Sequence, residues 1–329
     1  MINKNAYLNP KLFDPDLEQV PSRNGFGEGL VLAAEENEAV VGLCADLTES
    51  TRMQKFAEKF PQRFIEVGVA EQNLATVAAG MALGGKIPFI SSYATFSPGR
   101  NWEQIRTTIC YNDVPVKIIG SHAGVSVGPD GATHQALEDM AMMRALPNMV
   151  VISPVDSIEA RKATLAIVRL PKPCYMRLSR DKVPVITTNE TPFEVGKAEV
   201  FNEGTDVTVI ATGQMVYRAL LAAEELKLHK ISVRVINCHT IKPLDREAIL
   251  QAAEETGAIV TVEEHQVTGG LGGAVAELLS QNFPVPLKII GVEDRFGESG
   301  APNELLEKFG LTKEAIIKAI TLVLRMKGK

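Results

Sequence analysis

Short apolar runs rich in β-branched residues alternate with amphipathic stretches along most of the chain. In the first half these runs are AVVGLC (39–44), RFIEVGV (63–69), IPFISS (87–92), VPVKIIG (114–120) and NMVVISP (148–154). Apolar runs of this length, without alternating polar positions, are typical of strands that are buried on both faces. Because helical stretches separate them, the pattern predicts βαβ units around a parallel sheet.

A polar, proline-containing segment, DKVPVITTNETPFEVG (181–196), interrupts this alternation after the strand-like PCYMRLS. It has no helical periodicity and predicts a domain boundary. Strands and helices then alternate again, from DVTVIATG to the closing TKEAIIKAITLVLRMK. We therefore expect an α/β fold with two domains, each a mainly parallel sheet flanked by helices. The expected ranges are an N-terminal extension at 1–20, a first domain at 21–186 and a second at 187–329.

The composition supports a globular protein of this size. The chain has 329 residues, of which 45% are hydrophobic and 22% charged, and a formal net charge of -6. Two domains of ordinary size fit this length, and the acidic balance gives no reason to expect a nucleic-acid partner. We find no signal-peptide pattern and no apolar run long enough to span a bilayer, so we expect a cytoplasmic protein without membrane contact.

The four cysteines, Cys44, Cys110, Cys174 and Cys238, have apolar flanks and form no CxxC pair. Such flanks favour buried, reduced thiols over disulfides or a metal site.

Glu71 lies where a strand-like run leads into an alanine-rich helix, in RFIEVGVAEQNLATVAAGMALGG. One interpretation is an acidic residue in the first helical turn, which the helix dipole stabilises by a few tenths of a kcal/mol. The other is a carboxyl group in a partly buried pocket, where desolvation favours the protonated form. The spacing alone leaves both open.

Two aromatic residues, Tyr93 and Phe96, follow the next strand in ISSYATFSPGRNWEQIR. They are equally compatible with core packing and with a flat apolar platform for a heteroaromatic ring.

A glycine-rich segment, GSHAGVSVGPDGATHQALED, contains His122, Asp130 and His134. Zinc binding is conceivable, but the histidines are separated by flexible glycines and no short ligand pair is present, so we expect no metal site on this chain. Polar groups that bind a hydroxylated substrate fit this segment better.

Arg23, Ser50 in the loop DLTEST, and Arg180 are dispersed along the sequence. Each alone is most simply a solvated surface residue. Together they predict a phosphate clamp, because guanidinium groups match phosphate oxygens. The sequence contains neither GDG with a downstream asparagine nor GxxxxGK[ST], so it carries no diphosphate–magnesium motif of its own.

These motifs together resemble those of transketolases and 1-deoxyxylulose-5-phosphate synthases. VGVAEQN, the aromatic loop, GPDGATHQALED with MRALPNMVVISP, and MRLSR occur in the same order and spacing, and the resemblance continues through HTIKPLD, GAIVTVEEH and FGESG. The chain is most similar to the carboxy-terminal, pyrimidine-binding subunit of a split transketolase, a thiamine-diphosphate enzyme.

The resemblance implies a role for each candidate residue. Glu71 matches the glutamate that hydrogen-bonds the aminopyrimidine ring nitrogen and favours its imino tautomer. Phe96 matches the ring that stacks on the pyrimidine, Tyr93 a second ring of that pocket, and Asp46 a residue near the cofactor. His134 and Asp130 match residues that hold the donor sugar's hydroxyl groups. The resemblance also implies that His134, like Glu71, is a catalytic residue. The positions that match the sugar-phosphate site are Arg23, Ser50, His122 and Arg180.

Two positions depart from the family pattern. Pro129 stands where transketolases commonly have glutamate before DG. The segment around Gly99 is one residue longer than in single-chain relatives, so no role is assigned to Arg100.

The activity that the resemblance implies is transfer of a two-carbon ketol unit from a ketose phosphate such as xylulose 5-phosphate to an aldose phosphate such as ribose 5-phosphate, as in the pentose phosphate pathway. The diphosphate and Mg²⁺ would bind mainly to a partner N-terminal subunit in an α2β2 assembly. Alternatives are a 1-deoxyxylulose-5-phosphate synthase-like subunit, a 2-oxoacid dehydrogenase beta subunit, and a non-catalytic assembly subunit. The arginines and THQ favour sugar phosphates over 2-oxoacids.

Overall fold

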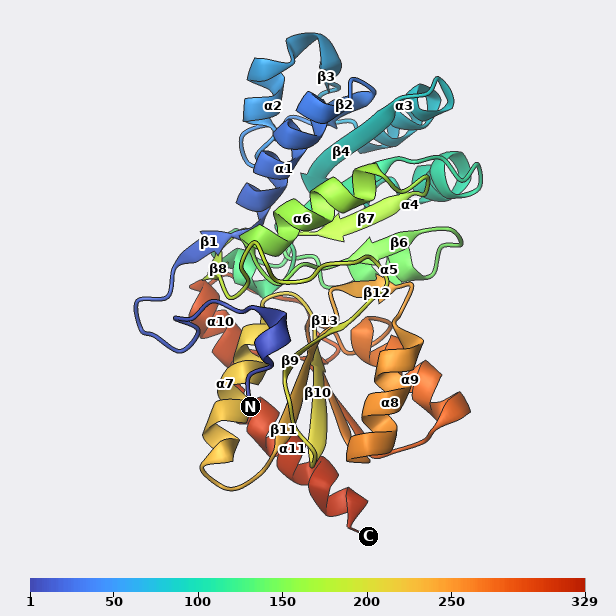
Figure 1. The fold of residues 1–329 in the computed structure, drawn as a ribbon. Coiled ribbons are helices and arrows are strands. Elements are labelled where there is room, and N and C mark those ends of the chain that lie inside the picture. The colour runs from blue at the N-terminus through green and yellow to red at the C-terminus, as the bar shows by residue number, and fades with distance from the viewer. Residues whose placement is uncertain (329) are drawn as a thin grey trace.

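The computed structural model describes residues 1–328. It contains two large open sheets, one above the other along the long axis of the molecule, and a separate two-stranded sheet (Figure 1). Each large sheet has helices on both faces, as the alternation of strands and helices predicts. The expected α/β fold with two mainly parallel sheets is confirmed.

The first sheet has seven strands and contains the five apolar runs of the first half of the sequence. Its order is β12 (Thr240–Lys242), β6 (Val150–Ile152), β7 (Cys174–Arg177), β5 (Lys117–Ser121), β4 (Ile87–Tyr93), β2 (Val40–Cys44) and β3 (Phe64–Glu66). All neighbours pair in parallel except β12, which runs antiparallel to β6. β2 and β5 are buried throughout, whereas β3 is only partly buried because it is an edge strand.

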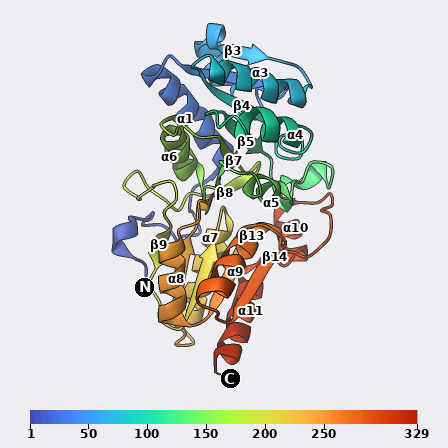
Figure 2. The same ribbon diagram turned by 90° about the vertical axis from the view of Figure 1, so that its right-hand side faces the viewer.

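Helices cover both faces of this sheet (Figure 2). One face carries α1 (Ser22–Glu36), α2 (Gln54–Lys59) and α6 (Ser157–Val168), and the other carries α3 (Glu71–Leu83), α4 (Trp102–Gln104), the π-helical segment η3 (Ile105–Cys110) and α5 (Asp139–Arg144). Glycines allow α1 and α6 to pack closely. A Cβ atom at Gly25 would lie 1.7 Å from the carbonyl oxygen of Ser157, and one at Gly29 would lie 2.8 Å from Cβ of Thr164.

The second sheet has five strands in the order β14 (Leu287–Val292), β13 (Ile259–Gln266), β10 (Val207–Ala211), β11 (Val233–Asn237) and β9 (Glu199–Asn202). Only β9 runs antiparallel to its neighbour. Its helices are α7 (Met215–Lys227) and α11 (Lys313–Lys327) on one face and α8 (Arg246–Thr256) and α9 (Leu271–Asn282) on the other. The short helix α10 (Pro302–Lys308) packs against η4 (Val125–Asp130), below the first sheet.

The two units exchange segments. The N-terminal residues include η1 (Lys4–Ala6) and pack against the second sheet, where Ala6, Leu12 and Leu17 join the core formed with α7 and α11. The chain then reaches the first sheet through β1 (Gln19–Pro21), which pairs with β8 (Lys182–Pro184). In the opposite direction, β12 lies beyond the boundary segment in sequence but joins the first sheet. Neither unit is therefore built from one continuous segment.

A buried charged network links the units. Nε of Arg177, at the end of β7, lies 2.9 Å from a carboxylate oxygen of Asp139, which also accepts a 2.7 Å hydrogen bond from the hydroxyl of Tyr175. Nη2 of Arg177 donates to the backbone oxygen of Glu264 on β13 at 2.7 Å. The Glu264 carboxylate in turn accepts the backbone N–H of Ser126 at 2.7 Å. The network therefore connects the two sheets through groups that are removed from water.

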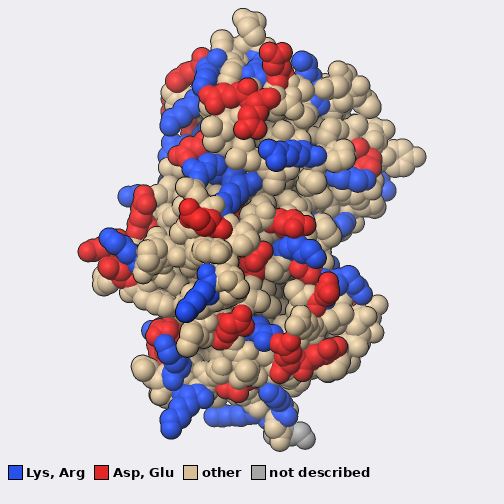
Figure 3. Space-filling model, viewed as in Figure 1, with Lys and Arg blue, Asp and Glu red and all other residues tan. Residues whose placement is uncertain are grey.

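Acidic and basic side chains are mixed over the face shown in Figure 3, without a large area of one sign. Within residues 1–328, no helix is both long and apolar enough to cross a bilayer.

The buried network predicts a large difference between two acidic substitutions. Asp139→Ala should lower the free energy of unfolding by about 3–5 kcal/mol, because it leaves the buried Arg177 guanidinium without its charge partner. The matched control is Glu277→Ala, whose side chain is 60% exposed and pairs with Arg144; it should cost less than about 1 kcal/mol. Urea unfolding of both variants measures the difference, and similar losses would contradict a special role for the network.

Candidate active site

Most of the candidate residues lie in loops that follow the carboxyl ends of β2, β4, β5 and β7. Parallel strands bring these ends to one edge of a sheet, which is where ligands bind in open α/β folds. Segments far apart in sequence, from Arg23 to Arg180, therefore meet at one edge of the first sheet.

Three rings form a column at this edge, which we call the ring column: Phe96, Tyr93 and His122. The centres of the Phe96 and Tyr93 rings are 5.8 Å apart and their planes differ by 20°. Tyr93 stacks on His122 at 3.8 Å and 23°. Phe96 and Tyr93 are both partly exposed, so they are available to a ligand and are not simply core residues.

Glu71 is the first residue of α3 and is 4% exposed. Its two carboxylate oxygens lie 3.1 and 3.2 Å from Nη1 of Arg100, whose guanidinium lies 4.2 Å from the centre of the Phe96 ring. Asn101 donates to the backbone oxygen of Glu71 at 2.9 Å. Glu71 thus lies in the first helical turn, as one interpretation predicted, and its side chain is also buried, as the other interpretation assumed.

His122 is 2% exposed and its Nε2 lies 3.1 Å from Nη1 of Arg23. A guanidinium only donates hydrogen bonds, so Nε2 accepts and the Nδ1–H donates to the Ser121 hydroxyl at 2.9 Å. Burial, followed by the charges of Arg23 and Arg180, lowers the pKa of His122 to about 2. His122 is therefore a neutral acceptor that orients Arg23, and it does not carry charge to a ligand.

Three arginines, Arg23, Arg52 and Arg180, lie close together beside His122; we call them the arginine cluster. Arg23 donates to the backbone oxygen of Ser50 at 2.6 Å. Burial, and then the charges of Arg52 and Arg180, lower the pKa of Arg23 to about 10. Like charges held together in this way are stabilised by an anion with several oxygens.

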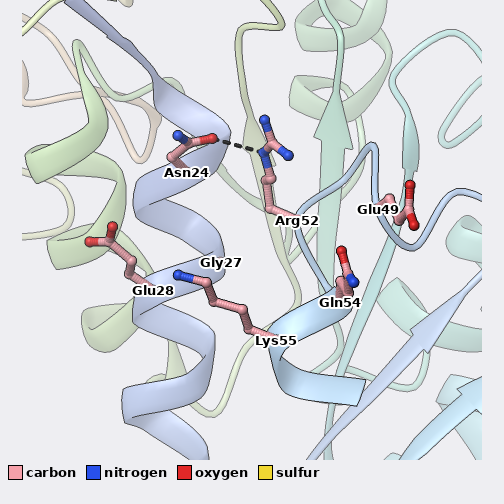
Figure 4. Close-up of a pocket in the computed structure, with 7 residues that line it drawn as sticks. All are labelled: Asn24, Gly27, Glu28, Glu49, Arg52, Gln54 and Lys55. Carbon is pink, nitrogen blue, oxygen red and sulfur yellow. Dashed lines mark hydrogen bonds between the residues drawn. The ribbon is translucent and has the colours of Figure 1, made fainter. Parts of the chain in front are cut away.

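Arg52 also lines a pocket of 310 Å³ between α1 and the segment that runs from the DLTEST loop into the start of α2. Its Nε donates to the side-chain oxygen of Asn24 at 2.8 Å (Figure 4). The residues that line the pocket are Asn24, Gly27, Glu28, Glu49, Arg52, Gln54 and Lys55. Arg52 directly follows DLTEST, but nothing in its local sequence distinguishes it from an ordinary surface arginine.

Asp130 and His134 lie at opposite ends of this arrangement. Oδ1 of Asp130 is 3.8 Å from Nη2 of Arg180, at the arginine cluster. His134 meets the Phe96 ring edge-on, with centres 5.3 Å apart, and its Nδ1 is 2.9 Å from the Thr133 hydroxyl. The structure therefore brings His134 to the platform and Asp130 to the arginines.

Two predicted residues contribute less directly. Asp46 is exposed, and its backbone N–H donates to Glu66 of β3 at 2.7 Å; across residues 1–328 its side chain forms no hydrogen bond. Ser50 offers Arg23 its backbone oxygen, and its hydroxyl takes no part in that contact.

The site fits an aminopyrimidine. The Arg100 guanidinium already lies between the Glu71 carboxylate and the Phe96 ring, so this space admits a flat N–C–N group that donates to the carboxylate.

All four cysteines are buried free thiols. In the part of the chain that the structure describes, no three His, Cys, Asp or Glu side chains are grouped so that they could hold a metal ion.

Two family models match the chain in succession. The transketolase pyrimidine-binding domain matches residues 18–185, and the transketolase C-terminal domain matches residues 196–316. Together they cover nearly the whole chain.

Individual proteins give the same result. A putative transketolase C-terminal section of Methanocaldococcus jannaschii is 46% identical, over 91% of this chain and 94% of its own length. The 6-deoxy-6-sulfo-D-fructose transketolase subunit SqwH of Clostridium sp. (strain MSTE9) is 44% identical, over 93% of this chain and 95% of its own. A solved structure described as a split gene transketolase, inactive beta4 tetramer, has a TM-score of 0.88 and 46% identity, and covers 94% of this chain and 99% of its own. This chain belongs to the transketolase family of thiamine-diphosphate enzymes, in which it corresponds to the pyrimidine-binding, carboxy-terminal subunit of a split transketolase.

Proposed function

We propose that this chain is the pyrimidine-side subunit of a transketolase that transfers a two-carbon ketol unit from a ketose phosphate, such as xylulose 5-phosphate, to an aldose phosphate, such as ribose 5-phosphate. The observation that carries the proposal is the ring column. It connects a buried carboxylate and an aromatic face at one end with the arginine cluster at the other. One site can thus hold a cofactor ring and a phosphorylated substrate together.

Different residues along this column would contact the cofactor ring and the sugar. Glu71 would hold a proton at the pyrimidine ring nitrogen, and Phe96 would support the ring face. Thiamine diphosphate supplies, when bound, the carbon nucleophile that adds to the ketose carbonyl and carries the two-carbon unit. His134, edge-on to Phe96, is placed to donate to or accept from a sugar hydroxyl.

The arginine cluster supports an anionic substrate. Three guanidinium groups match the oxygens of a phosphate, and neutral His122 fixes the direction of Arg23 without adding charge. This favours sugar phosphates over the 2-oxoacids of a dehydrogenase beta subunit. A sulfonate also presents three oxygens, and the relative from Clostridium is described as a sulfofructose transketolase subunit. A sulfosugar is therefore the second candidate substrate.

The sequence supports a partner chain. It holds no GDG with a downstream asparagine, so a second subunit would bind the diphosphate and Mg²⁺. An α2β2 assembly would place each cofactor between two chains.

Reconstitution tests this function. The chain alone should be inactive, and mixing it with an N-terminal transketolase subunit, thiamine diphosphate and Mg²⁺ should give ketol transfer from xylulose 5-phosphate to ribose 5-phosphate in a coupled assay. A parallel assay with pyruvate as donor detects a 1-deoxyxylulose-5-phosphate synthase activity instead. Full activity of the isolated chain would refute the need for a partner.

The arginine cluster predicts a selective effect on substrate affinity. Arg180→Ala should raise KM for phosphorylated sugars by about tenfold or more, because a charge-assisted contact to the phosphate is lost, and should change KM for unphosphorylated analogues little. The control is Arg169→Ala. The Arg169 side chain is 80% exposed and follows the last residue of α6. Equal increases for both kinds of sugar would remove Arg180 from phosphate binding.

The neutral His122 predicts a pH dependence of stability. Its pKa is lowered from 6.5 to about 2 in the folded chain, so below pH 6.5 the unfolded state binds a proton that the folded state does not. From pH 7 to pH 5 the wild type should lose about 2 kcal/mol of unfolding free energy relative to His122→Gln, whose side chain does not titrate. Urea unfolding at both pH values measures this, with exposed His229→Gln as the control. Parallel pH profiles for wild type and His122→Gln would show that His122 is not held neutral.

A further inference from the structure

Arg100 lies in the space that the proposed function gives to the aminopyrimidine ring. Its Nη1 contacts both carboxylate oxygens of Glu71, at 3.1 and 3.2 Å, and its guanidinium carbon is 4.2 Å from the centre of the Phe96 ring. Glu71 is the only hydrogen-bond partner of the Arg100 side chain among residues 1–328. The guanidinium thus uses the same two residues that a pyrimidine would use.

The two groups are chemically alike. A guanidinium is flat, carries N–H donors on an N–C–N unit and stacks on aromatic faces. An aminopyrimidine that shares a proton with a carboxylate presents a similar flat edge, with a ring nitrogen and an exocyclic amino group. Each satisfies the carboxylate and covers the Phe96 ring, so both cannot occupy the site together.

Burial shows which partner can leave. The Glu71 side chain is 4% exposed and that of Arg100 is 50% exposed. Removing the guanidinium alone would leave a buried carboxylate without a partner, which is costly, whereas Arg100 itself can move into water at little cost. Asn101 donates to the backbone oxygen of Glu71 at 2.9 Å, so the main chain at the start of α3 keeps this contact when Arg100 moves.

We propose that Arg100 is a surrogate for the cofactor in the unloaded chain: its guanidinium pairs with Glu71 on the Phe96 ring, and thiamine diphosphate must displace it to bind. The inference rests on the proposed cofactor site. It makes Arg100 a positioning residue, which preserves the direction of Glu71 before loading and weakens cofactor binding by competing for the same carboxylate.

A double-mutant cycle on the full chain without cofactor tests whether the pair exists. Arg100→Ala should lower the melting temperature by roughly 2 °C when Glu71 is present, and should have a smaller effect in a Glu71→Gln background, where residue 71 carries no charge. The fluorescence of Trp102, the only tryptophan and two residues from Arg100, reports the unfolding locally. Equal effects in both backgrounds would overturn the proposal, since the two side chains would not be coupled.

Cofactor affinity in the reconstituted complex tests the displacement. In titration calorimetry with thiamine diphosphate and Mg²⁺, the Kd of the Arg100→Ala complex for the cofactor should be at least about fivefold lower than that of the wild type. Arg106→Ala, an exposed arginine in η3, should bind like the wild type. Unchanged or weaker binding by Arg100→Ala would overturn the surrogate role alone. A wild-type complex that binds no thiamine diphosphate would instead refute the proposed function, and the surrogate role with it.

Discussion

The parallel pairing of β2, β4, β5 and β7 is the constraint on which the rest of the site depends. It fixes four strand ends side by side, and each end continues into a loop that carries part of the candidate chemistry. Backbone hydrogen bonds within a buried sheet hold these ends in register, because an unpaired backbone group away from water is costly. The loops can therefore be irregular, with positive φ angles at Asp46, Arg52 and His122, while their origins stay fixed.

Much of the fold follows from local patterns. The apolar runs at 39–44 and 87–92 predict β2 and β4 because a strand covered on both faces consists mainly of apolar side chains. The run at 63–69 predicts β3 but not its exposure, since an edge position depends on the order of the whole sheet. The pairing of β12 with β6 is likewise absent from the local sequence. It joins segments almost ninety residues apart, and a three-residue strand carries almost no periodicity of its own.

The candidate site shows the same division. Residue types and spacing marked Glu71, Phe96 and Arg180 as candidates but left core or surface roles equally open. The resemblance to transketolases as a whole was needed to give them roles. The side-chain contacts were not accessible in this way. The neutrality of His122 comes first from its burial and then from the charge of Arg23, 99 residues away in sequence. The contact of Arg100 with Glu71 depends on how the loop after β4 turns. The charge state of a side chain depends on its burial and on the charged groups near it in space, and sequence spacing does not show which groups these are.

The exchange of segments between the two units has a consequence for how this protein can be divided. The amino-terminal residues complete the core of the second sheet, and β12 forms the edge strand of the first. Cutting the chain at the boundary segment would therefore remove the amino-terminal residues from the second unit and β12 from the first. The boundaries between the two family-model matches are therefore not the boundaries of units that would fold independently. Because each unit contains a segment that the other part of the chain supplies, we expect the two sheets to unfold together and not as separate domains.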